Sequence, residues 1–413
     1  MSSSTVTVRI DRAGRDLDPV VVGSRSGLLW SRGDFTLAGV GEARRFRFER
    51  PDGGADVSAA LAELSGPNEV GVPGTGAVAF GAFPFQPSAR GELIVPEIVL
   101  GRGPEGRRWL TTFGGLNPDE ALSRLSALVQ RGHSTAGDEP SDYRLRSTLS
   151  PETWRDDVVA VARDRIQSGA LRKAVFAREL IVTTDHPIDP VVVLSRLHQS
   201  FRSSILFAVD GFIGASPELL VSRSGDVVRA HPLAGTAPRS SDPEADQGLA
   251  AGLLASAKDR GEHRITIDWL LDTLLPFCSY VDAEPEPTIV TLANVHHLGT
   301  RVEGRLSNPP TSVLDLVGAL HPTPAVGGDP QGVALQLISE LEQADRGRYA
   351  GPVGWVDAAG NGAFAVGIRS ATIAGNTARL FAGVGVVADS DPPAELAETR
   401  AKFQALLGAL IRP

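Results

Sequence analysis

The stretch RLFAGVGVVADSDPPAELAETRAKF, Arg379 to Phe403, places a predicted strand directly before a predicted helix. Apolar residues dominate the strand, Ala378 to Val387, in which Gly383 and Gly385 stand two residues apart. Because side chains alternate between the two faces of a strand, both glycines fall on one face and leave it bare. Glycine weakens a strand, so this pattern predicts a backbone that something else approaches closely.

Charged residues gather on one side of the helix that follows. The acidic and serine residues at 389–391 can cap it, and two prolines then suit its first turn. Glu395, Glu398 and Lys402 are three or four residues apart, so they share one helical face. That face is either a solvent-exposed stripe of salt bridges or one half of an ion site, and the stretch alone leaves both readings open.

A second acidic pair occurs in SAKDRGEHRITIDWLL, where Asp259 and Glu262 are also three residues apart. They stand directly before an expected amphipathic helix at 262–275. If the two pairs face each other, their carboxylates suit Mg²⁺, which takes one or two protein carboxylates together with waters and substrate oxygens. His263 is a weaker candidate because Mg²⁺ prefers oxygen ligands. A solvated helix face is again the other reading.

One arginine lies in a predicted strand of small residues, AFAVGIRSATI, from Ala363 to Ile373. Alternation puts Arg369 on a face whose other members are small, namely Ala365, Gly367 and Ala371. A guanidinium above such a floor suits a carboxylate ligand, although an arginine on a solvated face would give the same pattern. With Lys402 and Mg²⁺, Arg369 would select a small substrate that carries more than one carboxylate.

Composition excludes several classes of function. The 413 residues include 42% hydrophobic and 22% charged residues, as in a soluble globular protein. A net charge of −9 argues against a nucleic-acid or anionic-membrane partner, because such binding draws on clustered Lys and Arg. Cys278 is the only cysteine, so no intramolecular disulfide forms. The polar start and the lack of a long apolar run predict a cytoplasmic protein.

Strands and helices alternate along the whole chain, which predicts a layered α/β or α+β body. Short strands and a helix at 118–130 are expected up to about Val129, followed by a polar connecting loop from Arg131 to Ser150. Another helix begins at Pro151, with an apolar residue every fourth position, and ends at Gly169. Further strands are expected at 173–182, 205–209, 212–215, 219–222, 288–298 and 353–357, and further helices at 189–199, 243–257, 313–320 and 332–344.

Nine segments, taken in order, resemble the motif series of the chorismate-utilising enzymes, the family that includes anthranilate synthase component I. They are KAVFAREL, ASPELL, HPLAGTAPR, KDRGEH, NVHHLGT, LHPTPAVGG, RGRYAGPVGWV, FAVGIRSA and AGVGVVADSDPPAELAETRAKF. The resemblance implies a single domain of two β-sheets packed face to face and surrounded by helices. Within it, residues 1–145 would form the less distinctive N-terminal part and residues 150–413 the chorismate-binding catalytic region.

The resemblance also implies roles for individual residues. Glu262 and Glu398 would hold Mg²⁺ directly, and Asp259 and Glu395 would act through bound waters. The substrate would be chorismate, contacted by a further set of positions: Thr236, His297, Ala325, Tyr349, Arg369, Gly383, Gly385 and Lys402. Thr236 and His297 also have structural readings, since one can shape a turn and the other can satisfy a buried hydrogen bond.

Lys173 and Glu218 decide which reaction the resemblance implies. Members that add water to chorismate carry a lysine where Lys173 stands, and members that add ammonia carry a glutamine. A lysine acts as a general base only where its surroundings lower its pKa, and a strand-end lysine that reaches out to water is the other reading. Glu218 matches the general acid that protonates the departing C4 hydroxyl.

The implied enzyme is therefore an isochorismate synthase, an isomerase of menaquinone or siderophore biosynthesis. Ala325 favours it over the nearest alternative, a salicylate synthase that goes on to eliminate pyruvate. An ammonia-using anthranilate or aminodeoxychorismate synthase is disfavoured by Lys173, and a catalytically silent chorismate-binding protein is disfavoured by the intact acid and base. No glutaminase subunit and no partner chain are expected, so the enzyme would act as a monomer.

Overall fold

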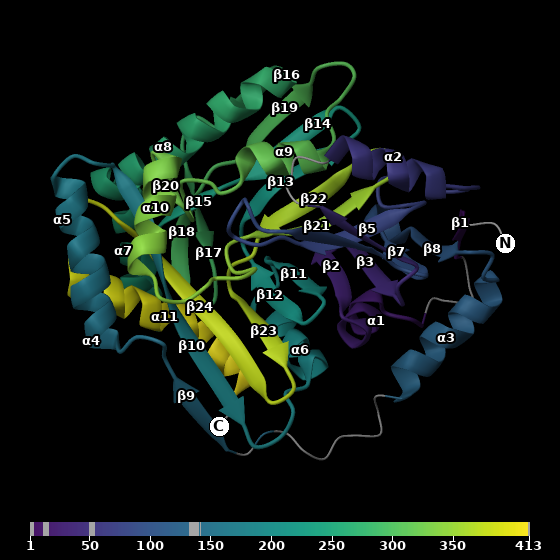
Figure 1. Ribbon diagram of the computed structural model, residues 1–413, viewed down its shortest axis with the longest axis horizontal. Helices are drawn as coiled ribbons and strands as arrows, with labels where there is room; N and C mark the ends of the chain where they lie inside the picture. The colour runs from purple at the N-terminus through teal and green to yellow at the C-terminus, as the bar shows by residue number, and fades with distance from the viewer. Residues whose placement is uncertain (1–3, 11–15, 49–53, 132–139, 141, 412–413) are drawn as a thin grey trace.

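Two large antiparallel sheets and one small sheet form the frame of the protein (Figure 1). The computed structural model describes residues 4–10, 16–48, 54–131, 140 and 142–411. Part of the loop expected from Arg131 to Ser150 lies outside these residues.

The largest sheet has twelve strands, contributed by both ends of the chain. Eleven run in the order β1 (Thr5–Arg9), β8 (Arg108–Phe113), β7 (Ile98–Arg102), β3 (Phe35–Val40), β2 (Leu28–Arg32), β11 (Ile205–Val209), β12 (Phe212–Ser216), β23 (Ser370–Ala374), β24 (Thr377–Val386), β10 (Lys173–Thr184) and β20 (Gly328–Asp329). The twelfth, β9 (Tyr143–Arg146), pairs with the far end of β10.

The second sheet has nine strands and the third has three. The second runs in the order β16 (Cys278–Ala283), β19 (Val302–Leu306), β14 (Val227–His231), β13 (Leu219–Ser224), β22 (Gly362–Val366), β21 (Pro352–Asp357), β5 (Val78–Ala82), β6 (Gly91–Val95) and β4 (Arg44–Phe48). The third consists of β15 (Leu233–Pro238), β18 (Val295–Gly299) and β17 (Thr288–Thr291).

The two large sheets pack face to face through an apolar core. Phe207 of β11 and Trp30 of β2 are buried with Phe80 of β5 and Trp355 of β21. The residue before Phe207 on β11, Leu206, belongs instead to the apolar cluster that holds the helices against the opposite face of this sheet. The period-2 alternation of buried side chains thus gives each sheet a sheet-facing side and a helix-facing side.

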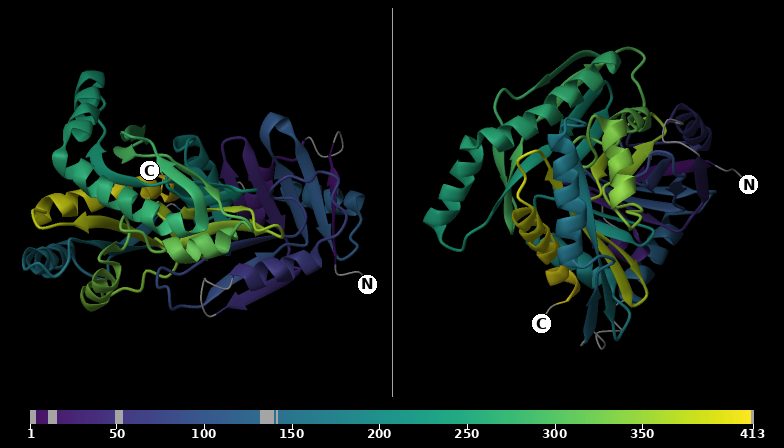
Figure 2. Two further views of the ribbon diagram at one scale, coloured as in Figure 1. Left: turned by 90° about the horizontal axis from the view of Figure 1, so that it is seen from above. Right: turned by 60° about the vertical axis from the view of Figure 1, so that its left-hand side comes forward.

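Helices cover the outer faces of both sheets, and Figure 2 shows them surrounding the strands. On the twelve-stranded sheet lie α6 (Pro190–Ser200), α11 (Pro392–Leu410), α1 (Pro19–Ser26) and α3 (Pro118–Arg131). α10 (Gln331–Leu341) also packs against this sheet, at β10 and β20. Elsewhere lie α2 (Gly54–Leu64), α7 (Pro243–Ala255), α8 (Ala257–Leu274) and α9 (Val313–Leu320). Two short helical turns, η1 (Pro104–Gly106) and η4 (Leu275–Phe277), lie in connections between other elements.

The helix expected from Pro151 contains an unusual segment. It consists of α4 (Pro151–Thr153), the π-helix η3 (Trp154–Ala160) and α5 (Val161–Gln167). Trp154, Val158, Ala162 and Ile166 are all buried, as their spacing predicts. An α-helix would rotate residues spaced by four steadily off the buried face, and the wider π turn corrects that drift.

The sequence correctly predicts the mixed α/β class with face-to-face sheets, and the residue pattern was wrong at several places. The strand predicted at 288–298 is two strands, β17 and β18, joined by a turn. The connecting loop contains β9. Asp259 lies inside α8 rather than before it, because Ser256 caps that helix and the helix begins at Ala257, five residues before the expected start. The strands β14, β15, β16 and β19 had no predicted counterpart.

A further error concerns Arg369. The predicted strand from Ala363 to Ile373 is two strands in different sheets, β22 and β23. The chain turns sharply between them, where the Ile368 amide donates to the Val366 carbonyl at 2.7 Å and Arg369 adopts a left-handed φ of 53°. Arg369 therefore stands at a corner between sheets and does not share a strand face with Ala365.

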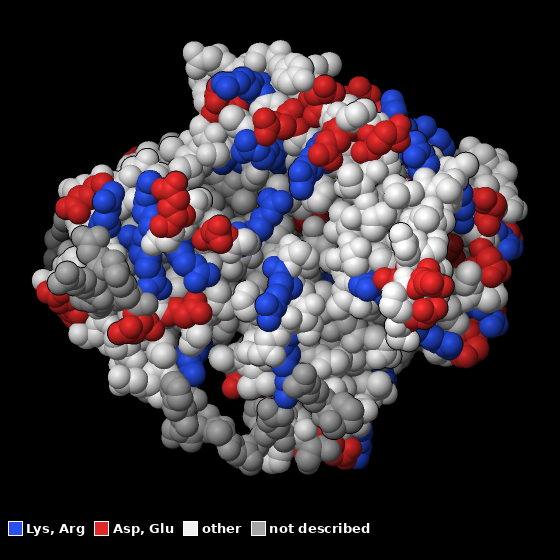
Figure 3. All heavy atoms as spheres, turned by 180° about the vertical axis from the view of Figure 1, so that it is seen from behind, with Lys and Arg blue, Asp and Glu red and all other residues white. Residues whose placement is uncertain are grey.

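The surface and the helices give two further facts. On the face seen in Figure 3, Lys and Arg side chains are interspersed with Asp and Glu side chains. Among the described residues, no helix is both long enough and apolar enough to cross a membrane.

Candidate functional site

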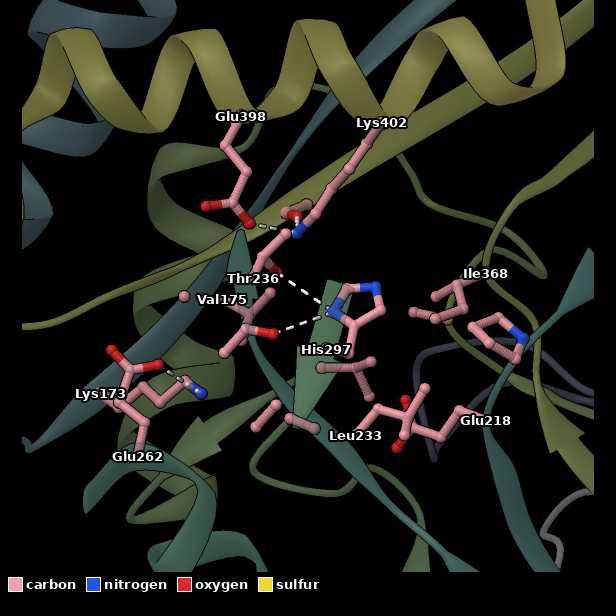
Figure 4. A pocket seen from close by; sticks show the side chains of 18 of the residues that line it. Lys173, Val175, Glu218, Leu233, Thr236, Glu262, His297, Ile368, Glu398 and Lys402 are labelled. Carbon is pink, nitrogen blue, oxygen red and sulfur yellow. Dashed lines mark hydrogen bonds and ion pairs between the residues drawn. The ribbon is translucent and has the colours of Figure 1, made fainter. Parts of the chain in front are cut away.

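One cavity of about 140 Å³ collects every residue to which the family resemblance gives a role, and His263, the weaker metal candidate, does not line it. Its walls come from β10, β24, the small sheet, α8, α11 and two corners between the large sheets. The nominated residues that line it are Lys173, Glu218, Thr236, Asp259, Glu262, His297, Ala325, Tyr349, Arg369, Gly383, Gly385, Glu395, Glu398 and Lys402. Figure 4 labels several of them, among them Lys173, His297 and Lys402, which approach one space from elements far apart in the sequence.

Glu218 and Arg369 occupy two neighbouring corners where the chain passes from one large sheet to the other. Glu218 lies between β12 and β13, and Arg369 lies between β22 and β23. The corners are hydrogen-bonded to each other, since the Val366 amide donates to the Glu218 carbonyl at 3.2 Å and the Ala215 amide donates to the Arg369 carbonyl at 3.1 Å. This pairing holds an acidic and a cationic side chain at one end of the cavity.

The carboxyl group of Glu218 is deeply buried. Burial raises its pKa to about 8, against the opposing effects of a backbone hydrogen bond from Leu233 and the positive charge of Lys173. At neutral pH this carboxyl group therefore carries a proton, which it can donate. It is the kind of perturbed group that marks catalytic sites.

Lys173 enters from the start of β10, and its side chain is only 4% exposed. Its ammonium nitrogen lies 3.6 Å from the Oε2 atom of Glu262 on α8. The side chain crosses the bare face of β24, where a Cβ added at Gly385 would stand 2.6 Å from the Lys173 Cε atom. The strand face without side chains that the sequence predicts thus makes room for Lys173, a side chain of the protein itself.

The acidic face of α11 also points into the cavity. Lys402 pairs with Glu398 at 2.6 Å and donates to the Gly383 carbonyl at 2.8 Å. Burial opposes ionisation of Glu398, yet Lys402 and neighbouring hydrogen bonds bring the pKa of Glu398 below its usual value. Burial, and then the charge of Glu398, raise the pKa of Glu395 to about 7. This face is therefore not a solvated stripe.

His297 and Thr236 sit opposite each other on paired strands of the small sheet. The His297 Nδ1 atom lies 2.9 Å from the Gly235 carbonyl, which only accepts, so Nδ1 carries the proton. Burial, and then the charge of Arg369, lower the pKa of His297 to about 3. Its Nε2 atom is consequently a free acceptor and lies 3.4 Å from an Arg369 nitrogen. A neutral histidine therefore helps to orient the arginine.

Tyr349 and Ala325 complete the wall beside β24. The Tyr349 ring stacks on Phe381 with ring centroids 5.3 Å apart, and its hydroxyl oxygen lies near Gly383. Ala325 belongs to a loop whose Val326 carbonyl accepts a 3.0 Å hydrogen bond from Arg346. Tyr349 is itself buried, and so is Val326, the neighbour of Ala325, so both residues are held in place.

Asp259 has a hydrogen-bond partner that the sequence did not suggest. The hydroxyl of Ser256, the residue that caps α8, donates to the Asp259 carboxylate at 2.5 Å. Sequence reasoning also missed Lys258, Arg346 and Ile368, which line the same cavity. Lys258 belongs to the KDRGEH motif and Arg346 to RGRYAGPVGWV, so motif membership was a signal that could have found both.

The residues of the cavity fit a magnesium ion, although no three His, Cys, Asp or Glu side chains among those described converge tightly enough to hold a metal alone. Mg²⁺ needs only one or two protein carboxylates, because water and substrate supply its other oxygens. Glu262 on α8 and Glu398 on α11 both reach the cavity, and each is now balanced by a lysine. Burial, and then the charge of Glu398, raise the pKa of Glu395, so a cation bound beside it would favour its ionised form.

Comparisons with known proteins agree on one family. The family described as "Chorismate binding enzyme" matches residues 23–411. The chain is 38% identical over 341 residues to isochorismate synthase DhbC of Bacillus subtilis, covering 80% of each protein. It is 39% identical over 370 residues to a putative isochorismate synthase, MenF, of Mycobacterium tuberculosis, covering 86% of this chain and 90% of that protein.

A solved structure shows the same fold. It is described as a putative 2,3-dihydroxybenzoate-specific isochorismate synthase, DhbC, from Bacillus anthracis. The two structures superpose with a TM-score of 0.79 at 34% identity, covering 94% of this chain and 96% of that chain.

Replacing Gly385 with alanine should displace the Lys173 side chain, because the new Cβ would stand 2.6 Å from its Cε atom. We expect the Lys173 to Glu262 distance in a crystal structure to change, while the free energy of unfolding falls by at most about 3 kcal/mol. Gly332→Ala is the control, since a Cβ there meets no atom within 4 Å. An unmoved Lys173 in the Gly385→Ala crystal structure would contradict this packing.

Proposed function

The chain belongs to the chorismate binding enzyme family, and from this premise we propose that it is an isochorismate synthase that converts chorismate to isochorismate with Mg²⁺. The observation that carries the proposal is the placement of a buried lysine and a buried, protonated carboxyl group in one cavity. Lys173 and Glu218 line it from β10 and from the corner after β12, and they stand on different sides of it in Figure 4. One is suited to take a proton and the other to give one.

The cationic groups define how the substrate lies. Chorismate carries two carboxylates, and Arg369 with Tyr349 would bind the one on the enolpyruvyl group. Lys402 would reach the ring carboxylate, and the neutral His297 keeps Arg369 aimed into the cavity. A guanidinium and a hydroxyl on fixed elements restrict the substrate to one orientation, which lowers the entropic part of the barrier.

The acid and base then act on opposite ends of an allylic system. Lys173, in its neutral form, takes a proton from water as the water oxygen bonds to C2 of the ring. The double bonds shift, the C4–O bond breaks, and Glu218 gives its proton to the departing hydroxyl, which leaves as water. One water enters and one leaves, so the reaction is an isomerisation. Lys173 ends protonated and Glu218 ionised, and a proton passing back through solvent resets both.

Magnesium would be held by Glu262 and Glu398, with Asp259 and Glu395 acting through bound waters. Bound there, the ion supplies positive charge that neutralises the ring carboxylate and fixes its position. The two lysines that now balance Glu262 and Glu398 would then be free for water and for substrate. This arrangement explains why one cavity holds several carboxylates for an anionic substrate.

The proposal is tested by incubating the purified protein with chorismate, with and without Mg²⁺ and with and without an ammonium salt. Chromatography should show isochorismate formed only in the presence of Mg²⁺, with no pyruvate and no effect of ammonium. Salicylate together with pyruvate would show that Ala325 does not limit the reaction to isomerisation. An aminated product would show that Lys173 does not specify water.

Removing either proton-transfer group should slow turnover without unfolding the protein. Lys173→Ala and Glu218→Gln should each lower kcat by about two to four orders of magnitude, the usual contribution of a general base or acid. The measurement is steady-state kinetics on variants whose circular dichroism spectra match that of the unchanged protein. Turnover near that of the unchanged protein in either variant would remove that residue from its assigned role.

Turnover should fall as the pH rises through about 8. Glu218 must hold its proton to act as an acid, and burial raises its pKa to about 8. We therefore expect kcat to drop about tenfold per pH unit on the alkaline side of this value. This alkaline fall in kcat should be absent from the residual activity of Glu218→Gln. An unchanged fall in that variant would assign the titration to another group.

Weakening one metal ligand should change the metal requirement. Glu262→Gln keeps the shape of the side chain but removes its charge, so the Mg²⁺ concentration for half-maximal activity should rise by tenfold or more. Glu303→Gln is the matched control, because Glu303 is exposed and pairs with Arg229 on the surface. An identical Mg²⁺ dependence in the two variants would defeat the ligand assignment.

A further inference from the structure

A single buried hydroxyl joins the two corners that carry Glu218 and Arg369. Ser216, the last residue of β12, has 0% exposure. Its Oγ atom lies 2.6 Å from the Val366 carbonyl oxygen, at the end of β22 and the start of the second corner. It also lies 3.2 Å from the amide nitrogen of Glu218, in the first corner. One side chain thus contacts the backbone of both corners.

Chemistry fixes the direction of both hydrogen bonds. A carbonyl oxygen only accepts, so the hydroxyl donates to Val366, whose oxygen at 2.6 Å is nearer than the Glu218 carbonyl oxygen at 3.4 Å, and its lone pair accepts from the Glu218 amide. The same Val366 carbonyl also accepts from the Ile368 amide at 2.7 Å, in the turn that leads to Arg369. Displacing the hydroxyl would therefore disturb the backbone of both corners, and Glu218 most directly.

No solvent reaches these groups to replace a missing partner. The relative exposure is 3% for Glu218 and 2% for Val366. Unpaired polar groups at such depth cost free energy, so the backbone would move to find new partners. The Glu218 carboxyl group, two bonds beyond its own Cβ, would move with it.

We propose that Ser216 is a positioning residue that sets the Glu218 carboxyl group relative to the substrate clamp at Arg369. This inference rests on the proposed function of Glu218 as the general acid. Ser216 itself touches no reacting atom, because it does not line the cavity. It acts through Glu218 and should affect the chemical step more than the binding of substrate.

The test compares Ser216→Ala with Ser31→Ala in the full-length protein. Ser31 is the matched control, since it is 5% exposed, lies in the same sheet, and makes a buried 2.9 Å hydrogen bond to Thr36 away from the cavity. Ser216→Ala should lower kcat by about tenfold to a hundredfold, the cost of a small misplacement of a reacting group, while the KM for chorismate changes less than about threefold. Ser31→Ala should change neither quantity.

A double-mutant cycle separates positioning from general stability. In the Glu218→Gln background, adding Ser216→Ala should cause no further loss of kcat, because the group through which it acts is already gone. An equal fold loss in both backgrounds would overturn the proposal, as would a kcat for Ser216→Ala equal to that of Ser31→Ala. If Ser216→Ala does not fold, Ser216→Cys keeps the size and a weaker donor and takes its place in the cycle.

A readout without substrate keeps this inference separate from the proposed function. Infrared difference spectra against Glu218→Gln report the protonated carboxyl group of Glu218. Its titration should move to lower pH in Ser216→Ala, because a loosened corner admits water, and should not move in Ser31→Ala. If the unchanged protein fails to convert chorismate, the proposed function falls, and an unshifted titration would overturn the positioning role independently.

Discussion

The site depends on two neighbouring corners, at each of which the chain passes from one large sheet to the other. At each corner the strand direction changes, so the backbone loses its regular partners and must find others. The corners satisfy each other through hydrogen bonds between residues 215 and 369 and between residues 218 and 366. As a result, an acid from one part of the sequence and a cation from another reach the same cavity at fixed positions.

Charge balance in a small buried volume is the second constraint. Lys173 with Glu262 and Lys402 with Glu398 are pairs whose members would be costly to bury alone. Because β24 lacks side chains at Gly385, the Lys173 stem can cross it and reach its partner. Each pair keeps a lysine and a carboxylate together in the buried cavity, so neither charge is left without a partner.

The sequence predicted these features unevenly, for physical reasons. Helix α11 and strand β24 were readable because capping residues, helical spacing and strand alternation are local signals. The corner at Arg369 was not, because small and apolar residues flank it on both sides and only the pairing with other strands shows that β22 and β23 lie in different sheets. The start of α8 was missed because its Ser256 cap precedes charged residues that hide the helical period.

The residues of the site, too, divide into those that local sequence signals predicted and those that they did not. The acidic pairs could be found by spacing, and the assignment of Lys173 and Glu218 needed the resemblance to a family. The link through Ser216 could be found only in three dimensions, since it joins residues 150 positions apart. Motifs indicate which side chains matter, and tertiary pairing shows which groups hold them in place.

The most direct test of a reaction in which Lys173 activates water is to run it in water enriched in ¹⁸O. We expect each isochorismate molecule to carry one ¹⁸O atom, on the C2 hydroxyl group, because the oxygen bound there comes from solvent and the C4 oxygen departs. Mass spectrometry with fragment analysis would locate the label. Isochorismate without ¹⁸O would mean that the hydroxyl group moves within the substrate, which would contradict the roles assigned to both Lys173 and Glu218.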